Sequence, residues 1–116
     1  MKIERISDRL SVSPQIQVSD VSHLSKLGFA AIINNRPDGE SDDQPTSAEL
    51  AQEAHRHGLV YAHIPVIPGR IEQRDVQAFV HAQQSLDGPV LAFCRSGMRA
   101  TQLWAITSER HQGSGG

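Results

Sequence analysis

The stretch that decides the fold is Val90-Leu91-Ala92-Phe93-Cys94-Arg95-Ser96-Gly97-Met98-Arg99-Ala100. It opens on an apolar run, and continuous rather than alternating apolar residues are typical of a strand buried on both faces. A short turn containing Gly97 follows, and a helix is predicted to begin near Arg99. The single cysteine, Cys94, is therefore predicted at the carboxyl end of a buried strand, where ligands bind in open parallel sheets.

Two earlier apolar runs predict the rest of a parallel sheet. Ala30–Ile33 and Val60–Ile64 precede this strand at intervals of about 30 residues, and a helical stretch follows each. That order is typical of right-handed βαβ units. Ile3–Ile6 and Leu10–Val12 flank a polar turn and predict an antiparallel hairpin or edge strand. The predicted fold class is α/β, with three layers and a central, mostly parallel sheet flanked by helices.

Capping residues mark four helices, and the clearest is a capping box that begins at Thr46. The predicted helices run from Ser19 to Leu27, from Thr46 to Gly58, from Ile71 or Glu72 to about Leu86, and from near Arg99 towards Glu109. We expect one domain over residues 1–110, a mobile polar loop over Asp38–Pro45, and a flexible tail over residues 111–116.

Composition and charge exclude several classes of function. The chain has 116 residues, of which 38% are hydrophobic and 21% charged, the balance of a globular domain. A net charge of −2 provides no basic face for nucleic acid. No apolar run is long enough to cross a bilayer, and the first residues lack a secretion signal. A single free thiol is typical of a reducing compartment, so we expect a cytoplasmic location, no disulfide and no membrane partner.

The turn after the cysteine has the features of an anion site. Its backbone N–H groups can converge on an anion, with the positive end of the next helix behind them. Thiols in such surroundings have pKa values of roughly 3.5–7.5, and an arginine can bind an oxyanion through two N–H groups. The catalytic candidates are Cys94 and Arg99, and the anion-binding candidates are Arg95, Ser96, Gly97 and Met98.

Each of these residues also has a structural interpretation. A lone cysteine at a strand end is often a small buried hydrophobe. The hydroxyl of Ser96 can donate to the thiolate or can instead cap the following helix. Met98 can line the mouth of a pocket or simply pack against the loop. Two arginines, a glycine and a helix start close to Cys94 favour the reactive thiolate over the buried hydrophobe.

Several motifs resemble known families. Cys94–Arg99 resembles the active-site loop of single-domain rhodanese sulfurtransferases, and its place between strand and helix resembles the phosphate loop of tyrosine phosphatases. Ile32–Glu40, with Val12–Ile16 before it and His63–Val66 after it, is similar to the beta-lactamase-hydrolase-like, phosphatase-like family, a domain of unknown function. The resemblance covers roughly Ile3–Ile106. It implies a tyrosine-phosphatase-like fold, a hydrolase or sulfurtransferase activity, and a persulfide dioxygenase-like domain as partner.

Two departures from tyrosine phosphatases bear on the reaction. Four residues separate Cys94 from Arg99, one fewer than in those enzymes. The segment Pro65–Arg70 contains no Asp or Glu to act as the general acid that protonates a leaving oxygen. Three carboxylates elsewhere could act as the general acid: Asp38, Glu40 and Glu72. The alternative interpretation is that they are solvated residues of a loop or of the first turn of a helix.

We therefore predict a sulfurtransferase that carries sulfane sulfur as a Cys94 persulfide, because sulfur transfer releases a stable anion and needs no acid. Its partner is a small-molecule sulfur donor or another anion, and no cofactor is expected. One alternative is a phosphatase-like hydrolase that works through a Cys94 phosphocysteine. A second is a non-catalytic module that binds an anion or a phosphorylated partner.

The remaining candidates are weaker. Arg36 and Asp38 follow the first central strand, so they either form a pocket rim or belong to a turn with an internal salt bridge. His55, His57 and His63 do not have the converging spacing of metal ligands, and no metal site is predicted. A single helix after the loop leaves room for an exposed apolar face, which makes a homodimer a candidate assembly.

Overall fold

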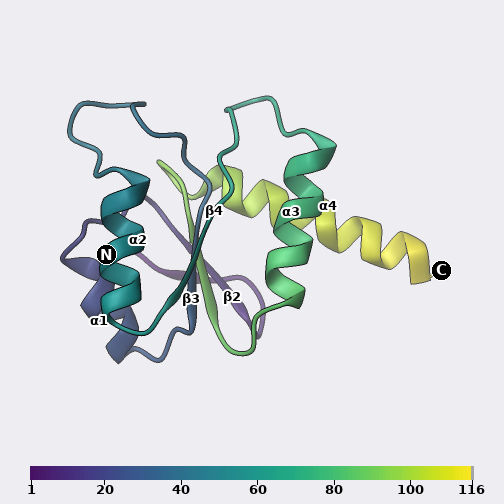
Figure 1. Cartoon of the computed structure of the whole chain (residues 1–116). Coiled ribbons are helices and arrows are strands. Elements are labelled where there is room, and N and C mark those ends of the chain that lie inside the picture. Colours follow the sequence, from purple (N-terminus) through teal and green to yellow (C-terminus); the bar gives the residue numbers. More distant parts are fainter. Residues whose placement is uncertain (116) are drawn as a thin grey trace.

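The computed structural model describes the backbone of residues 1–115 and the side chains of residues 1–108. From β2 onwards, strands and helices alternate along this part of the chain (Figure 1). Their bounds are β1 (Glu4–Arg5), β2 (Leu10–Ser13), α1 (Asp20–Lys26), β3 (Ala31–Asn34), α2 (Ser47–Arg56), β4 (Val60–His63), α3 (Gln73–Gln84), β5 (Val90–Phe93) and α4 (Met98–Gly115).

The strands form one sheet in the order β1-β2-β5-β3-β4. β2, β5, β3 and β4 are parallel, and β1 pairs with β2 in the antiparallel sense. Ser13, Phe93, Asn34 and His63 lie level with one another at the ends of these strands. The loops that leave the four strands therefore meet at one edge of the sheet, the upper edge in Figure 1. The expected α/β class with a mostly parallel central sheet is confirmed.

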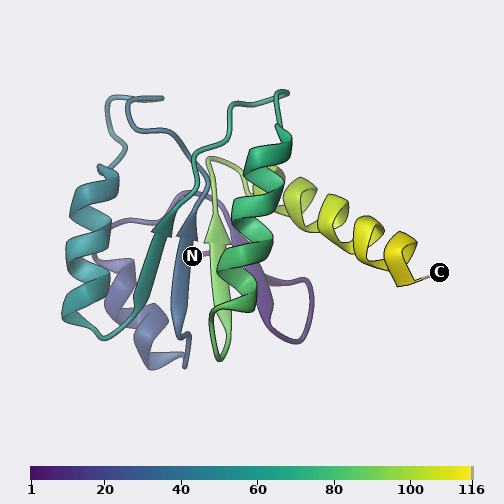
Figure 2. The same cartoon turned by 45° about the vertical axis from the view of Figure 1, so that its right-hand side comes forward.

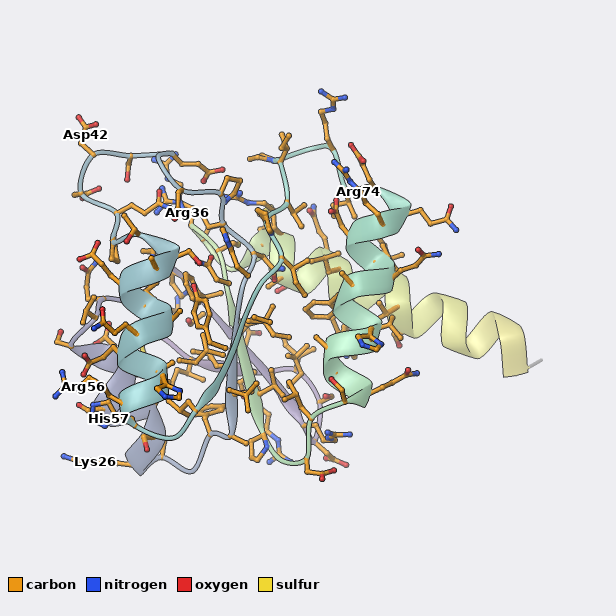
Figure 3. All side chains as sticks on the ribbon, viewed as in Figure 1. Lys26, Arg36, Asp42, Arg56, His57 and Arg74 are labelled. Atoms are coloured by element: carbon orange, nitrogen blue, oxygen red, sulfur yellow. The ribbon has the colours of Figure 1, made fainter. Side chains whose placement is uncertain are left out.

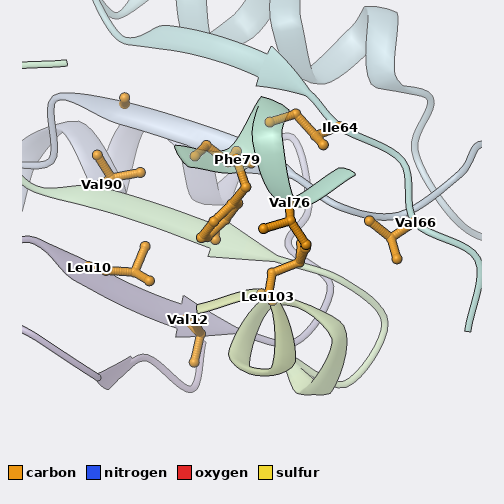
Figure 4. Close-up of a cluster of buried hydrophobic side chains, with 12 residues drawn as sticks. Leu10, Val12, Ile64, Val66, Val76, Phe79, Val90 and Leu103 are labelled. Atoms are coloured by element: carbon orange, nitrogen blue, oxygen red, sulfur yellow. The ribbon is translucent and has the colours of Figure 1, made fainter. Parts of the chain in front are cut away.

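Helices cover both faces of the sheet, with α1 and α2 on one side and α3 and α4 on the other (Figure 2). Alternate residues of β5 face the two layers. Val90 and Ala92 face the core that contains α3 and α4, whereas Leu91 and Phe93 face the core that contains α1 and α2. Figure 4 shows the first core, in which Phe79 of α3 is fully buried. β3 and β5 are buried along their whole length, as their apolar sequences predict.

The predicted helix signals are mostly confirmed. The capping box at Thr46 is present, and Gly28 and Gly58 take positive φ angles of 95° and 73° just beyond α1 and α2. Ser19 lies at the predicted N-cap position of α1, but its side chain makes no capping hydrogen bond. The carboxylate of Asp20 instead accepts a hydrogen bond from the N–H of Gln17.

Two other expectations need correction or extension. The continuous apolar run at Val60–Ile64 is typical of a strand buried on both faces, but β4 is an edge strand and Val60 is 53% exposed. The backbone of α4 continues as helix to Gly115, over most of the segment expected to be a tail, and residue 116 lies outside the described residues. None of the helices in the described part of the chain has the length and apolar character needed to cross a membrane.

Candidate active site

Cys94 follows β5 directly and is fully buried at the edge where the loops meet. The N–H of Gly97 donates a hydrogen bond to its Sγ at 3.1 Å, so the turn folds back onto the sulfur. Gly97 has a φ of +91°, and a Cβ there would lie 3.3 Å from the carbonyl oxygen of Ser13. Glycine is therefore required by both the backbone conformation and the close approach of β2.

The rest of the loop leaves several N–H groups available. Ser96 Oγ accepts a hydrogen bond from the N–H of Met98 at 3.3 Å, which is the helix-start role, and among the described residues it makes no bond to the thiol. The backbone N–H groups of Arg95, Ser96 and Arg99 donate to no acceptor in the part of the chain that the structure describes. They lie before or within the first turn of α4, where unpaired N–H groups favour an anion.

Arg99 extends from α4 into the site and is almost fully buried. Nη1 donates to Glu40 Oε2 at 2.8 Å and to the carbonyl oxygen of Val66 at 2.9 Å, and Nη2 donates to Glu40 Oε1 at 2.9 Å. The hydrogen bonds that Arg99 donates to Glu40 raise the pKa of the guanidinium, and Cys94 contributes in the same direction. The guanidinium is therefore permanently charged.

Glu40 is shared by two arginines. Arg36 Nε donates to Glu40 Oε1 at 2.9 Å, the same oxygen that accepts from Arg99 Nη2. The hydrogen bonds from Arg99, and then those from Arg36, hold the pKa of Glu40 below its usual value in spite of partial burial. Glu40 is therefore an ionised structural carboxylate and a poor proton donor. We had expected it to be a solvated loop residue or a substitute acid.

The other two candidate acids are also engaged elsewhere. Asp38 Oδ1 accepts a hydrogen bond from the N–H of Ser47 at 2.8 Å and so caps α2. The Glu72 side chain takes part in the capping box of α3 and pairs with Arg74 at 2.9 Å. None of these three carboxylates is available as a general acid in this arrangement.

Arg36 lies at the loop edge of the sheet (Figure 3), but its side chain is only 4% exposed. Its other donors bind Gln15 Oε1 at 2.9 Å and Ser41 Oγ at 3.4 Å. Arg36 therefore holds the side chains of Gln15, Glu40 and Ser41 together. The internal salt bridge expected in this turn joins Arg36 to Glu40 and not to Asp38.

Arg95 and Met98 lie on the outside of the loop. The carbonyl of Arg95 accepts a hydrogen bond from the N–H of Gln15 at 3.2 Å, and its side chain is exposed. Met98 is 63% exposed and, with Gly97, Ser96 and Pro14, lines a cavity of about 380 Å³ beside the loop. The structure therefore places Met98 at a pocket wall.

Asn35 follows β3 and is fully buried. Its Nδ2 donates to the carbonyl of Ile64 at 2.9 Å, but its Oδ1 has no partner in the described structure. Two of the histidines have partners of another kind: His63 Nε2 bonds to the carbonyl of Arg36, and His57 pairs with Glu53. Within the described residues, no three His, Cys, Asp or Glu side chains are grouped to hold a metal ion.

A cysteine at the end of a central parallel strand, a tight turn of free N–H groups and an arginine from the next helix define a tyrosine-phosphatase-like α/β domain. TpbA from P. aeruginosa shares this fold, with a TM-score of 0.59 at 18% identity over 82% of this chain and 54% of that chain. The chain belongs to the family described as beta-lactamase hydrolase-like protein, phosphatase-like domain, which matches residues 2–110.

Similar proteins are found by sequence and by structure. The chain is 40% identical to the beta-lactamase hydrolase-like protein of Xylella fastidiosa over 107 residues, 92% of this chain and 25% of that protein. It thus spans about a quarter of that relative. A candidate phosphatase of known structure from Neisseria meningitidis has a TM-score of 0.83 at 36% identity, over 90% of this chain and 74% of that one. One from Shewanella putrefaciens has a TM-score of 0.81 at 25% identity, over 95% of this chain and 69% of that one.

Proposed function

We propose that this domain is a sulfurtransferase that carries sulfane sulfur as a persulfide of Cys94. One observation carries the proposal: Asp38, Glu40 and Glu72 are all held in structural hydrogen bonds or ion pairs. Phosphate ester hydrolysis needs an acid for its leaving oxygen, whereas sulfur transfer to a thiolate does not. The site therefore favours sulfur transfer, the reaction that needs no general acid.

With thiosulfate as donor, the reaction has two balanced steps. The Cys94 thiolate attacks the sulfane sulfur, a new S–S bond forms, and sulfite leaves with the electron pair of the S–S bond that breaks. A thiolate or cyanide then attacks the outer sulfur of the persulfide and releases the Cys94 thiolate. No proton is transferred to the leaving group in the first step, and no external oxidant or reductant is needed.

The residues around Cys94 have distinct roles in this scheme. Arg99 and the free N–H groups of Arg95 and Ser96 hold the oxygens of the donor, and later the negative charge of the persulfide. The Gly97 N–H stabilises the sulfur of Cys94 at 3.1 Å. The chemistry requires a reduced thiol, so we propose the cytoplasm as the compartment.

The second candidate is a phosphatase-like hydrolase, and membership of a phosphatase-like family favours it. Cys94 would attack phosphorus, and water would then hydrolyse the phosphocysteine. Because Asp38, Glu40 and Glu72 are all engaged elsewhere, we expect this reaction only with esters whose leaving group needs no proton, such as p-nitrophenyl phosphate.

The test compares three substrates with the same protein: thiosulfate with cyanide, p-nitrophenyl phosphate, and phosphoserine. The proposal predicts thiocyanate formation that is faster than release of phosphate from either ester. Hydrolysis of phosphoserine that is faster than thiocyanate formation would contradict it and favour the phosphatase. We further propose a persulfide-oxidising, dioxygenase-like protein as the sulfur acceptor, to be tested by oxygen consumption when Cys94 persulfide is added to such an enzyme.

A further inference from the structure

We propose that the cavity beside the Cys94 loop is a second binding site, and that its ligand is a free α-amino acid with an apolar side chain. The cavity has a volume of about 380 Å³, which is within the range of small-molecule sites. Cys94 is fully buried and does not line it. The inference therefore goes beyond the proposed function and does not depend on it.

The cavity lies between the first two strands and the start of α4. Val12 of β2 faces the core that contains α4 (Figure 4), and Glu4 of β1 is its partner across the antiparallel pair. Residues directly opposite each other in such a pair point to the same face of the sheet, so Glu4 lies on the α4 side. Met98 and Thr101, which are about one turn apart on α4, line the cavity from the helix.

The wall of the cavity is mostly apolar, because two of its hydroxyl groups donate to carbonyl oxygens of the protein. Ser13 Oγ donates to the carbonyl of Pro14 at 2.9 Å. Thr101 Oγ1 donates to the carbonyl of Gly97 at 2.9 Å. Met98 adds an exposed thioether side chain, which can adapt its shape to the group that it contacts. These surfaces favour an aliphatic or aromatic group.

Two side chains of opposite charge, Lys2 and Glu4, complete the lining. Both are exposed, and neither forms an ion pair within the part of the chain that the structure describes. A purely anionic ligand is attracted by Lys2 but repelled by Glu4, and the reverse holds for a cation. A zwitterion is attracted by both, because its carboxylate can bind the Lys2 ammonium and its ammonium the Glu4 carboxylate. An apolar amino acid combines these two charges with the apolar group that the wall favours.

The experiment compares three probes that share a phenylethyl skeleton. L-Phenylalanine carries both charges, hydrocinnamate carries only the carboxylate, and phenethylamine carries only the ammonium. Each probe is titrated into isotope-labelled protein at neutral pH, and the amide chemical shifts of Gly97, Met98 and Thr101 report the Kd and the place of binding. The measurement does not require any sulfurtransferase activity.

For wild type we expect L-phenylalanine to bind about two- to fivefold more tightly than either singly charged probe, the effect of one solvent-exposed charge pair. Lys2→Gln should remove the preference over phenethylamine and keep the preference over hydrocinnamate, and Glu4→Gln should do the opposite. Lys26→Gln is the matched control, because Lys26 lies exposed at the end of α1 (Figure 3), and it should change neither preference.

Met98→Ala removes apolar contact but no charge, so it should weaken all three probes alike and leave both preferences as in wild type. Three results would overturn the proposal: no saturable shift at the cavity with any probe, equal affinity of wild type for the three probes, or the same change of preference in Lys2→Gln and Glu4→Gln. Sulfur loading from thiosulfate is measured separately. If the crossed preferences are found but Cys94 takes up no sulfur, the proposed function fails while the second site stands.

Discussion

Replacement of Arg99 by lysine tests the geometry of the site most closely. The substitution keeps a positive charge but replaces five planar donors with three on one nitrogen. Arg99 uses three N–H groups for Glu40 and Val66 and keeps two for the donor. A lysine that keeps only one contact to each of Glu40 and Val66 has a single N–H left.

The expected loss follows from this count. One charge-assisted hydrogen bond to the donor disappears, at a cost of about 1.5–3 kcal/mol. Because about 1.4 kcal/mol corresponds to a tenfold change in rate, kcat/KM for thiosulfate should fall by about 10- to 150-fold. The free energy of unfolding should fall by a similar amount, about 1.5–3 kcal/mol, since one internal charge-assisted hydrogen bond to Glu40 is lost.

The assay is thiocyanate formation from thiosulfate and cyanide, with urea unfolding measured on the same samples. Arg56→Lys is the matched control, because Arg56 is an exposed residue of α2 that pairs with Glu53. It should keep full activity. An Arg99→Lys enzyme as fast as wild type would refute the two-donor argument, and so would a loss of activity fully explained by unfolded protein.

Three further predictions concern the loop, pH and the core. Gly97→Ala should lower stability by about 1–2 kcal/mol and slow sulfur loading, because φ is +91° and the new Cβ meets the Ser13 carbonyl; wild-type urea midpoints and rates would contradict this. The pKa of Glu40 is lowered by Arg99 in the folded state, so its contribution to stability is present above the unfolded value of about 4.3 and is lost as pH falls below it. The gap in urea midpoint between wild type and Glu40→Gln should therefore be large at pH 7 and narrow below pH 4, and a constant gap would argue against an ionised, paired Glu40. Phe79→Ala, in a fully buried position, should cost about 3–5 kcal/mol in thermal or urea unfolding, and a cost below about 1 kcal/mol would contradict the packing of α3.

Much of the fold could be predicted because its signals are local. The apolar run of β5, the glycine of the turn and the helix start lie within eleven consecutive residues, and the capping box at Thr46 spans four. The burial of β4 was harder to predict, because its apolar sequence resembles that of β3 although β4 lies at the edge of the sheet. Burial of an edge strand depends on sheet order, which strand sequences alone do not determine.

The site was predicted only in part, for the same physical reason. Cys94 and Arg99 share one local motif, but the bond from Arg99 to Glu40 joins distant segments and depends on how the loop after β3 folds. The spacing of Arg36 and Glu40, with Gly39 between them at a φ of +79°, was the available signal of a turn that pairs these two side chains. A polar loop sequence does not reveal which of its carboxylates faces inward.

The central claim is that Cys94 accepts sulfur, and intact-mass spectrometry after thiosulfate or polysulfide treatment tests it most directly. The account predicts that wild type gains the mass of one sulfur atom, that cyanide or a thiol removes it, and that Cys94→Ser gains nothing. If wild type takes up no sulfur from any donor, or if Cys94→Ser takes up as much as wild type, the sulfurtransferase account is contradicted.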